Sequence, residues 1–179
     1  MDVFAYSTFT AVMTFVAMGL AALVLVGRLW LSSETRAGLA DGGRWLAWLV
    51  AASCMAGSLI FSEVYTLKPC LFCWYQRIAL YPLAVILLVG AMRRDRSIRY
   101  YGLPLSIIGL GISVWHILVQ NVSALRGVGA CDPDNPCSAK LVDLFGFVSI
   151  PVMAAAGFFL ISVLLAFFST HPTPVSENQ

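Results

Sequence analysis

The sequence predicts an all-α membrane protein, because it is apolar, poor in charge and divided into long uncharged stretches. Of the 179 residues, 60% are hydrophobic and 11% are charged, whereas soluble domains carry about 25% charged residues. Five stretches contain no Asp, Glu, Lys or Arg: 3–27, 45–62, 78–92, 100–125 and 144–170. A spanning helix needs roughly 20 mostly apolar residues, so we expect five transmembrane helices joined by short loops.

The first and third stretches require separate arguments. The first, 3–27, could be a secretory signal peptide, but no basic residue precedes it and Arg28 follows it. Its apolar core is also about twice the roughly 7–15 residues of a signal peptide, so we expect a retained helix. The third, 78–92, reaches a spanning length only if its helix starts near Cys73 and includes Arg77 at the interface.

Basic residues indicate which side of the membrane each loop occupies, because they collect in cytoplasmic loops. Seven arginines fall in the loops after the first and third helices: Arg28, Arg36, Arg44, Arg93, Arg94, Arg96 and Arg99. The other side has four basic residues: Lys68, Arg77, Arg126 and Lys140. We therefore expect the N-terminus outside and the C-terminus in the cytoplasm. The four loop cysteines then lie outside, where disulfides persist.

The segment 67–77, Leu-Lys-Pro-Cys-Leu-Phe-Cys-Trp-Tyr-Gln-Arg, places a Cys-x-x-Cys pair at the outer end of the third helix. The reactive thiolate is favoured at a helix N-terminus, near a cation and within Cys-x-x-Cys. Pro69 presets the chain for the start of a helix whose positive end faces Cys70 and Cys73. Arg77 lies one turn beyond Cys73 on the same face. The segment predicts reversible thiol–disulfide chemistry next to an anionic redox partner.

Other interpretations of these residues stay open. Arg77 could be an interfacial anchor whose side chain reaches the lipid head groups. The Cys-x-x-Cys pair could be a static disulfide or half of a zinc site. Zinc would need two further ligands, and the separation of Cys131 and Cys137 fits no common short zinc motif. We therefore predict no metal site.

A second cysteine pair follows the fourth predicted helix, in the sequence Cys-Asp-Pro-Asp-Asn-Pro-Cys from Cys131 to Cys137. Its Pro, Asp and Asn residues favour tight turns, so the two sulfurs can meet easily. Asp132 and Asp134 disfavour thiolates here by charge repulsion, unlike the cationic surroundings of the first pair. This contrast is expected if electrons pass between the pairs by thiol–disulfide exchange. The alternative is a disulfide that only pins the loop.

Three polar or reactive residues lie inside the predicted helices. His116 is in the outer third of the fourth helix, and an ionisable group within a membrane is a functional candidate by default. The alternative is a histidine bonded to a neighbouring helix or a head group. Cys54 is expected to be a packing residue and Glu63 an interfacial one, and neither is assigned a role.

Together these residues resemble the disulfide bond formation proteins of the DsbB family. The segment 67–77 is similar to the family's Leu-Lys-Pro-Cys-x-x-Cys-x-Tyr-x-Arg, and Asp-Leu-Phe-Gly at 143–146 with Pro151 resembles its approach to the last helix. His116 falls where the family often has a histidine. The short second loop and Cys-Trp-Tyr-Gln-Arg are similar to the BdbC-like branch of Gram-positive bacteria. The resemblance covers about 46–168.

The resemblance implies a four-helix transmembrane bundle in a bacterial plasma membrane, with a quinone, ubiquinone or menaquinone, bound near its outer surface. It implies a quinone-dependent enzyme that reoxidises an extracytoplasmic DsbA-like thioredoxin-fold thiol oxidase, supporting disulfide formation in exported proteins. Cys70 and Cys73 would be the quinone-side pair, with Cys73 at the quinone. Arg77 would stabilise the reduced quinone, and His116 would line the same pocket. The second pair would face the partner, with Cys131 forming the mixed disulfide.

The chain departs from the family in two places. Its second loop is too short for the amphipathic loop helix of the proteobacterial members, which leaves open how the two pairs meet. The first predicted helix is additional to the four-helix core, and it would pack against the bundle or bind a partner. We expect an additional N-terminal helix at 1–30, the four-helix domain at 44–170 and a disordered polar tail at 171–179.

Two other functions are kept as alternatives. A vitamin-K-epoxide-reductase-like enzyme is also a helical bundle with Cys-x-x-Cys and a quinone, although the Tyr-x-Arg after the pair argues against it. A non-catalytic membrane scaffold with structural disulfides belongs to a different class. The net charge of +2 and the lack of a cationic patch predict no nucleic-acid partner. The expected partners are the thiol oxidase, the quinone and the lipid bilayer.

Overall fold

The structure is a computed structural model, and it describes residues 3–125, 131–132 and 134–168. Five helices in this part of the chain are long and apolar enough to cross a membrane. They are α1 (Val3–Trp30), α2 (Ser33–Leu59), α3 (Leu71–Met92), α4 (Ile98–Asn121) and α5 (Ile150–Phe168). The prediction of an all-α membrane protein is therefore confirmed. The tail expected at 171–179 lies outside the described residues.

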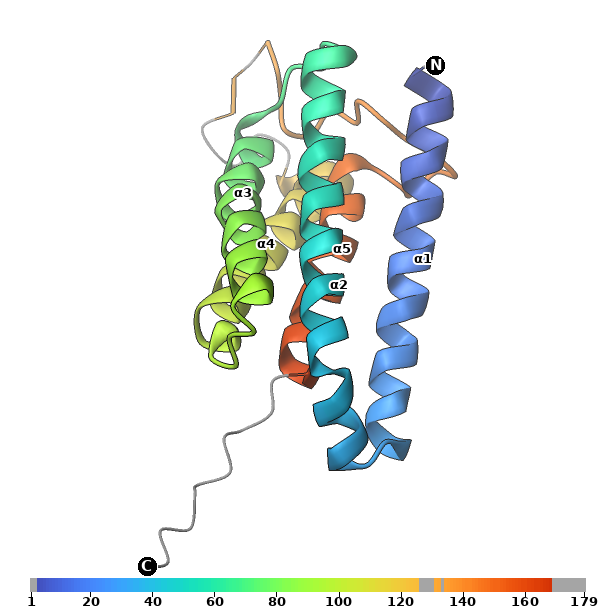
Figure 1. Ribbon diagram of the computed structural model, residues 1–179. Helices are drawn as coiled ribbons and strands as arrows, with labels where there is room; N and C mark the ends of the chain where they lie inside the picture. Colours follow the sequence, from blue (N-terminus) through green and yellow to red (C-terminus); the bar gives the residue numbers. More distant parts are fainter. Residues whose placement is uncertain (1–2, 126–130, 133, 169–179) are drawn as a thin grey trace, which may run out of the picture.

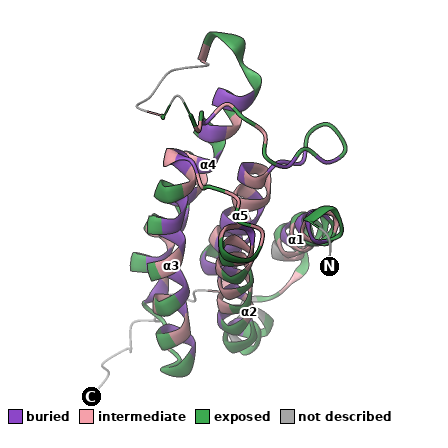
Figure 2. Ribbon diagram, turned by 90° about the horizontal axis from the view of Figure 1, so that it is seen from above, coloured by how far each residue is buried: buried purple, intermediate pink, exposed green. Residues whose placement is uncertain are grey.

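Helices α2 to α5 form a ring of four, and α1 lies beside it. In sequence order they contact one another, α2 with α3, α3 with α4 and α4 with α5, and α5 closes the ring on α2. Successive helices run in opposite directions (Figure 1). Helix α1 packs on α5, and the view from above shows it at the side of the bundle away from α3 (Figure 2).

The two ends of the bundle carry different segments (Figure 1). One end has the start of α1, the chain between α2 and α3, and the long connection between α4 and α5. Helix α2 continues at this end as a π-helical turn, η1 (Ile60–Val64), and α4 is followed by a 3-10 turn, η2 (Ser123–Leu125). The other end has the short connections 31–32 and 93–97. All four loop cysteines are therefore at the first end.

The connection between α1 and α2 is shorter than the sequence indicated, which corrects the loop expected there. Three arginines assigned to that loop lie within helices instead: Arg28 in α1, and Arg36 and Arg44 in α2. The cause is a helix cap, because the N–H of Thr35 donates to Oγ of Ser32 at 3.3 Å. Such a cap satisfies one of the N–H groups that the start of a helix leaves open.

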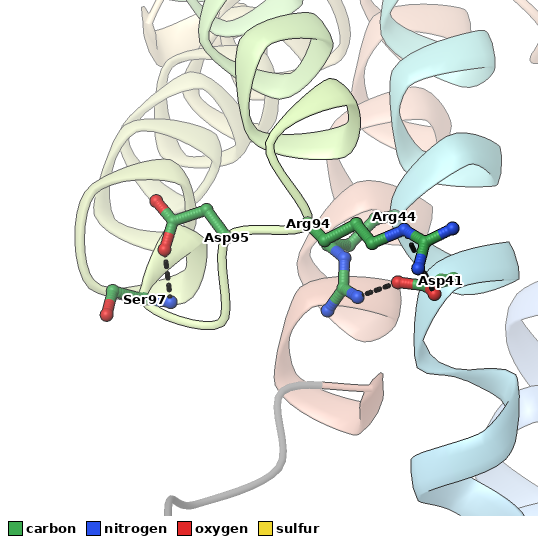
Figure 3. Close-up of polar contacts among 5 residues, drawn as sticks. All are labelled: Asp41, Arg44, Arg94, Asp95 and Ser97. Carbon is green, nitrogen blue, oxygen red and sulfur yellow. Dashed lines mark hydrogen bonds and ion pairs between the residues drawn. The ribbon is translucent and has the colours of Figure 1, made fainter.

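Polar contacts join α2 to the α3–α4 connection at the arginine-rich end (Figure 3). Asp41 of α2 pairs with Arg44 of the same helix and lies 3.8 Å from Nε of Arg94. In the connection itself, the N–H of Ser97 donates to Oδ1 of Asp95 at 2.7 Å. Arg44 is buried, but Asp41 is half exposed and Arg94 is largely exposed. Ion pairs with exposed members contribute at most about 1 kcal/mol each, so helix packing is the main stabilising contribution.

Glycines let α5 approach its neighbours closely. A Cβ on Gly109 of α4 would lie 2.3 Å from a ring carbon of Phe158, and one on Gly157 would lie 2.6 Å from Sγ of Cys54. Phe158 and the residues around it are almost fully buried. Small residues at such contacts are typical of membrane helices, because they let backbones come together.

Gly109→Ala should therefore destabilise the protein, since inserting an atom into a packed contact costs typically about 1–3 kcal/mol. The measurement is the thermal unfolding midpoint in detergent. Gly111→Ala is the matched control, because it lies in the same helix and its Cβ would have nothing within 4 Å. The control should unfold at the wild-type temperature or slightly above it. Equal midpoints for the two variants would contradict this packing of α4 on α5.

Candidate functional site

The first cysteine pair lies at the start of α3. Pro69 disfavours helical backbone in the residue before it, so the helix begins after the proline. Cys70 is the N-cap, with an extended backbone (φ −73°, ψ 174°), and Leu71 is the first helical residue. The sulfur atoms of Cys70 and Cys73 are 3.0 Å apart as free thiols. The pair therefore lies at the positive end of the helix.

The second pair is closed and lies against the first. Cys131 and Cys137 form a disulfide with their Cα atoms 5.9 Å apart. Cys137 is only 2% exposed, whereas Cys131 is partly exposed. All four cysteines belong to one apolar cluster, together with Phe72 of α3 and Val119 of α4. The structure thus brings the four predicted cysteines together at one site.

His116 of α4 links the two pairs. Its Nε2 lies 3.6 Å from Sγ of Cys70 and 3.1 Å from the carbonyl oxygen of Cys137. Its ring packs against Phe72, with the two centroids 5.5 Å apart. The family resemblance implies that His116 lines the quinone pocket. In the structure it lines a small cavity with Cys70 and Gln120, on the side of the second loop.

Polar contacts hold the second loop against the bundle. Gln120 of α4 donates to the carbonyl oxygen of Ala139 at 3.3 Å and accepts from Oγ of Ser149 at 2.9 Å. Asn135 donates to the carbonyl oxygen of Lys68, just before the first pair, at 3.4 Å. These bonds and the apolar cluster explain how the pairs meet across a short loop, which the resemblance left open.

The surroundings of Cys70 favour its thiolate. The hydrogen bond from the Cys73 thiol lowers the pKa of Cys70 most strongly, burial opposes this, and the contact with His116 lowers it further. The result is a pKa of about 4, against an ordinary value of 9.0. A stabilised thiolate favours the dithiol over the disulfide, and this makes the disulfide of the pair more oxidising.

The reduced pair should therefore hold a thiolate well below neutral pH. Because the pKa in the folded protein is lowered, Cys70 loses its proton as the pH rises through about 4. An ordinary thiol loses its proton only as the pH approaches 9.0. The ultraviolet absorbance of the thiolate, followed against pH with the loop disulfide intact, measures this. His116→Phe keeps a ring on Phe72 but removes Nε2, so the midpoint should rise; an unchanged midpoint would contradict the role of His116.

Arg77 lies one turn beyond Cys73 and is only 9% exposed. Its Nε donates to Oγ of Ser58 at 2.9 Å, and its Nη2 donates to the carbonyl oxygen of the same residue at 2.8 Å. The guanidinium also lies 5.3 Å from the ring centroid of Trp74. Among the described residues no carboxylate lies within ion-pair distance of Arg77. A buried cation without an anion is costly, so this position suits a negatively charged ligand.

A cavity of about 410 Å³ opens beside Cys73 and Arg77. Gln76 also lines it, is 5% exposed, and has no hydrogen-bond partner for its Nε2 within the described chain. Most of the remaining lining consists of apolar side chains from α1, α2 and α5. Cys73 lines this cavity, whereas Cys70 lines the small cavity with His116. The two sulfurs of one pair therefore face different surroundings.

Sequence reasoning missed two residues of this site. Gln76 had a signal, because it is an uncharged polar residue one turn after Cys73 and next to Arg77 in a mostly apolar helix. Ser58 had none, because its part depends on the contact between α2 and α3.

A metal interpretation of the first pair can also be compared with the structure. The donor atoms of Cys70, Cys73 and His116 all lie within 4.8 Å of one another. A structural zinc ion takes four protein ligands. The two cysteines considered as its other ligands, Cys131 and Cys137, are joined to each other in the loop disulfide. The zinc site in that form is therefore not supported.

A bundle of membrane-spanning helices with a dithiol beside a disulfide at one end defines the class of membrane disulfide oxidoreductases. The chain belongs to the DsbB family, because the family model for "Disulfide bond formation protein DsbB" matches residues 42–168. It is therefore a multi-pass, disulfide-forming membrane protein. The resemblance found in the sequence is confirmed.

Curated relatives carry similar names. A "Probable disulfide formation protein" of Oceanobacillus iheyensis is 48% identical over 120 residues, which are 66% of this chain and 83% of that protein. "Disulfide bond formation protein C" of Bacillus subtilis is 42% identical over 119 residues, 66% of this chain and 86% of the relative. "Probable disulfide formation protein C 2" of Bacillus cereus is 40% identical over 128 residues, 72% of this chain and 91% of the relative. No solved structure matches the chain.

Proposed function

We propose that the chain reoxidises a DsbA-like thioredoxin-fold thiol oxidase outside the cytoplasm and passes the electrons to a membrane quinone. The observation that supports this most is the difference between Cys70 and Cys73. Cys70 contacts His116, whose Nε2 also bonds the loop of the second pair. Cys73 lines the large cavity together with Arg77. Electrons that enter the pair at Cys70 would therefore leave it at Cys73.

The loop disulfide is the proposed first acceptor. A thiolate of the reduced partner attacks Cys131, the more exposed sulfur, and Cys137 leaves as a thiolate. The second thiol of the partner then attacks its own bridged sulfur, which releases Cys131 and leaves the partner oxidised. Two electrons and two protons have then passed to Cys131 and Cys137.

The second exchange takes place between the two pairs. The Cys137 thiolate attacks Cys70 of an oxidised Cys70–Cys73 pair, and Cys73 leaves as a thiolate beside Arg77. Cys131 then attacks Cys137, which restores the loop disulfide and releases Cys70. The low pKa of Cys70 stabilises the dithiol that results, and this favours electron flow toward the first pair.

The donors at the cavity fit a quinone ring. Nε2 of Gln76 is buried and unpartnered among the described residues, and the Arg77 guanidinium is buried without an anion. A quinone has carbonyl oxygens to accept from such donors, and these oxygens gain negative charge on reduction. When bound, a quinone supplies a two-electron acceptor that leaves as the quinol. The role of the protein is to hold the quinone ring near Cys73, to neutralise the negative charge on its oxygens with Arg77 and to exclude water with the apolar walls of the cavity.

The proposed orientation follows from the arginines. The end with the short connections 31–32 and 93–97 would face the cytoplasm, because basic residues collect on that side. The cysteine end would then face the oxidising side of a bacterial plasma membrane, where a secreted thiol oxidase can reach Cys131. The family match favours this function over a vitamin-K-epoxide-reductase-like one.

The test uses the purified full-length chain in liposomes with a reduced DsbA-like partner and a quinone. Quinone absorbance and trapping of partner thiols are followed together. We expect quinone to be consumed in step with partner disulfides formed. Oxidation of the partner without loss of quinone would contradict the proposal that quinone accepts the electrons. If neither is consumed, the non-catalytic scaffold is the better account.

A further inference from the structure

Helix α1 forms one wall of the large cavity, although it lies outside residues 42–168 that the family model matches. Its lining residues run from Tyr6 to Leu20. At 1.5 Å per residue these positions span about 21 Å along the helix. The cavity is therefore long as well as wide, and it extends from the cysteine end toward the middle of the membrane-spanning region.

The two ends of the cavity differ in polarity. The end near Cys73 is lined by Gln76, Arg77 and Ser58, whereas the far end is lined by apolar residues such as Leu20 and Leu46. Along the α1 wall, Oγ1 of Thr14 donates to the carbonyl oxygen of Thr10 in the same helix at 2.9 Å. The hydroxyl of Thr10 likewise bonds to the backbone of α1. The wall therefore offers few free polar groups.

We propose that α1 is part of the quinone site and holds the isoprenoid tail of the quinone against α2 and α5. This rests on the proposed function, which places the ring near Cys73. A membrane quinone is a polar ring on a long apolar tail, and the cavity has the same order of polar and apolar ends. Helix α1 packs on α5, and the seam that it leaves with α2 is the space that the tail fills.

The test fills this space in the full-length chain. Ala17 of α1 lines the cavity, whereas Ala22 of the same helix is exposed and is not among the lining residues. Ala17→Phe should raise the Kd of a quinone with a full isoprenoid tail by about tenfold, through lost apolar burial. It should leave the Kd of the same ring without a tail unchanged. Ala22→Phe is the matched control and should change neither.

Binding is measured by quenching of tryptophan fluorescence, with a benzoquinone ring and a naphthoquinone ring each tried in both forms. An unchanged ratio of the two Kd values in Ala17→Phe would overturn the role of α1 while leaving the proposed function standing. A wild-type chain that binds no quinone would overturn the proposed function itself. A lipid acyl chain would then be the better occupant of the cavity.

A second measurement needs no substitution. A quinone analogue with a photoreactive diazirine at the end of its tail is bound to the wild-type chain and illuminated. Mass spectrometry should find the label on α1 peptides around Met13 to Leu20, and excess unlabelled tailed quinone should remove it. Labels confined to α3 and α4 would overturn the proposal even if Ala17→Phe fails to fold.

Discussion

Cys73→Ala should abolish repeated oxidation of the partner, lowering the quinone-dependent rate by at least about three orders of magnitude, the scale seen when an enzyme loses its nucleophile. Cys73 is the sulfur of its pair that lines the large cavity, so electrons have no exit without it. Both loop cysteines are retained in this variant, so each chain still holds one disulfide that the partner can reduce. One equivalent of partner should therefore still be oxidised per chain, and counting partner disulfides against chains measures this limit.

A comparison with Cys70→Ala separates the two sulfurs. Both variants should lose repeated turnover. Only Cys73→Ala keeps the Cys70 sulfur, whose thiolate loses the hydrogen bond from Cys73 but keeps the contact with His116 and its place in one apolar cluster with the loop disulfide. With no Cys73 to compete, this thiolate should attack Cys137 and leave a trapped Cys70–Cys137 bond with Cys131 free. Mass spectrometry after thiol trapping should detect that bond. Sustained quinone consumption by Cys73→Ala would show that electrons leave by another group.

The helices were the most predictable part of this protein, because each membrane-spanning helix contains a long uncharged stretch of sequence. The start of α3 was predictable for a local reason as well, since Pro69 disfavours helical backbone in the residue before it and α3 begins at Leu71. The segment after α1 is harder to predict, because Arg36 and Arg44 interrupt the apolar sequence although both lie in α2. The local signal for this helix start is Ser32, whose side chain caps the N–H of Thr35.

The features of the site that lie within a single helix could be predicted from the sequence. The spacing of Cys70, Cys73 and Arg77 fixes which of them share a face of α3, and this is a property of a single helix. The cavity, by contrast, exists only where three or more helices meet. The sequence cannot say that Ser58 of α2 holds Arg77 or that His116 lies on the side of the loop rather than of the cavity. Those facts depend on how α2 and α4 pack against α3 and the second loop.

Arg77→Met should weaken quinone binding strongly without destabilising the fold. Hydrogen bonds to charged groups are worth about 1.5–3 kcal/mol, so the KM for quinone should rise by about tenfold to a hundredfold. Arg77 is buried and has no carboxylate partner within the described chain. Removing a buried charge that has no anion relieves the cost of keeping it out of water, and this offsets the loss of the two hydrogen bonds to Ser58, so the thermal midpoint should stay or rise.

Weaker quinone binding together with unchanged or higher stability distinguishes a ligand-binding arginine from an interfacial anchor. An anchor would lower stability when removed and would leave the KM unchanged, and that result would contradict the assignment. Arg77→Lys is the matched control, because it keeps the charge but loses the two-pronged contact with Ser58. In that contact Nε donates to the hydroxyl at 2.9 Å and Nη2 donates to the carbonyl oxygen at 2.8 Å. The KM of Arg77→Lys for quinone should lie between those of the wild-type chain and Arg77→Met. Ser58→Ala, which removes only the hydroxyl acceptor, should raise the KM less than Arg77→Met, because the charge itself remains beside Cys73.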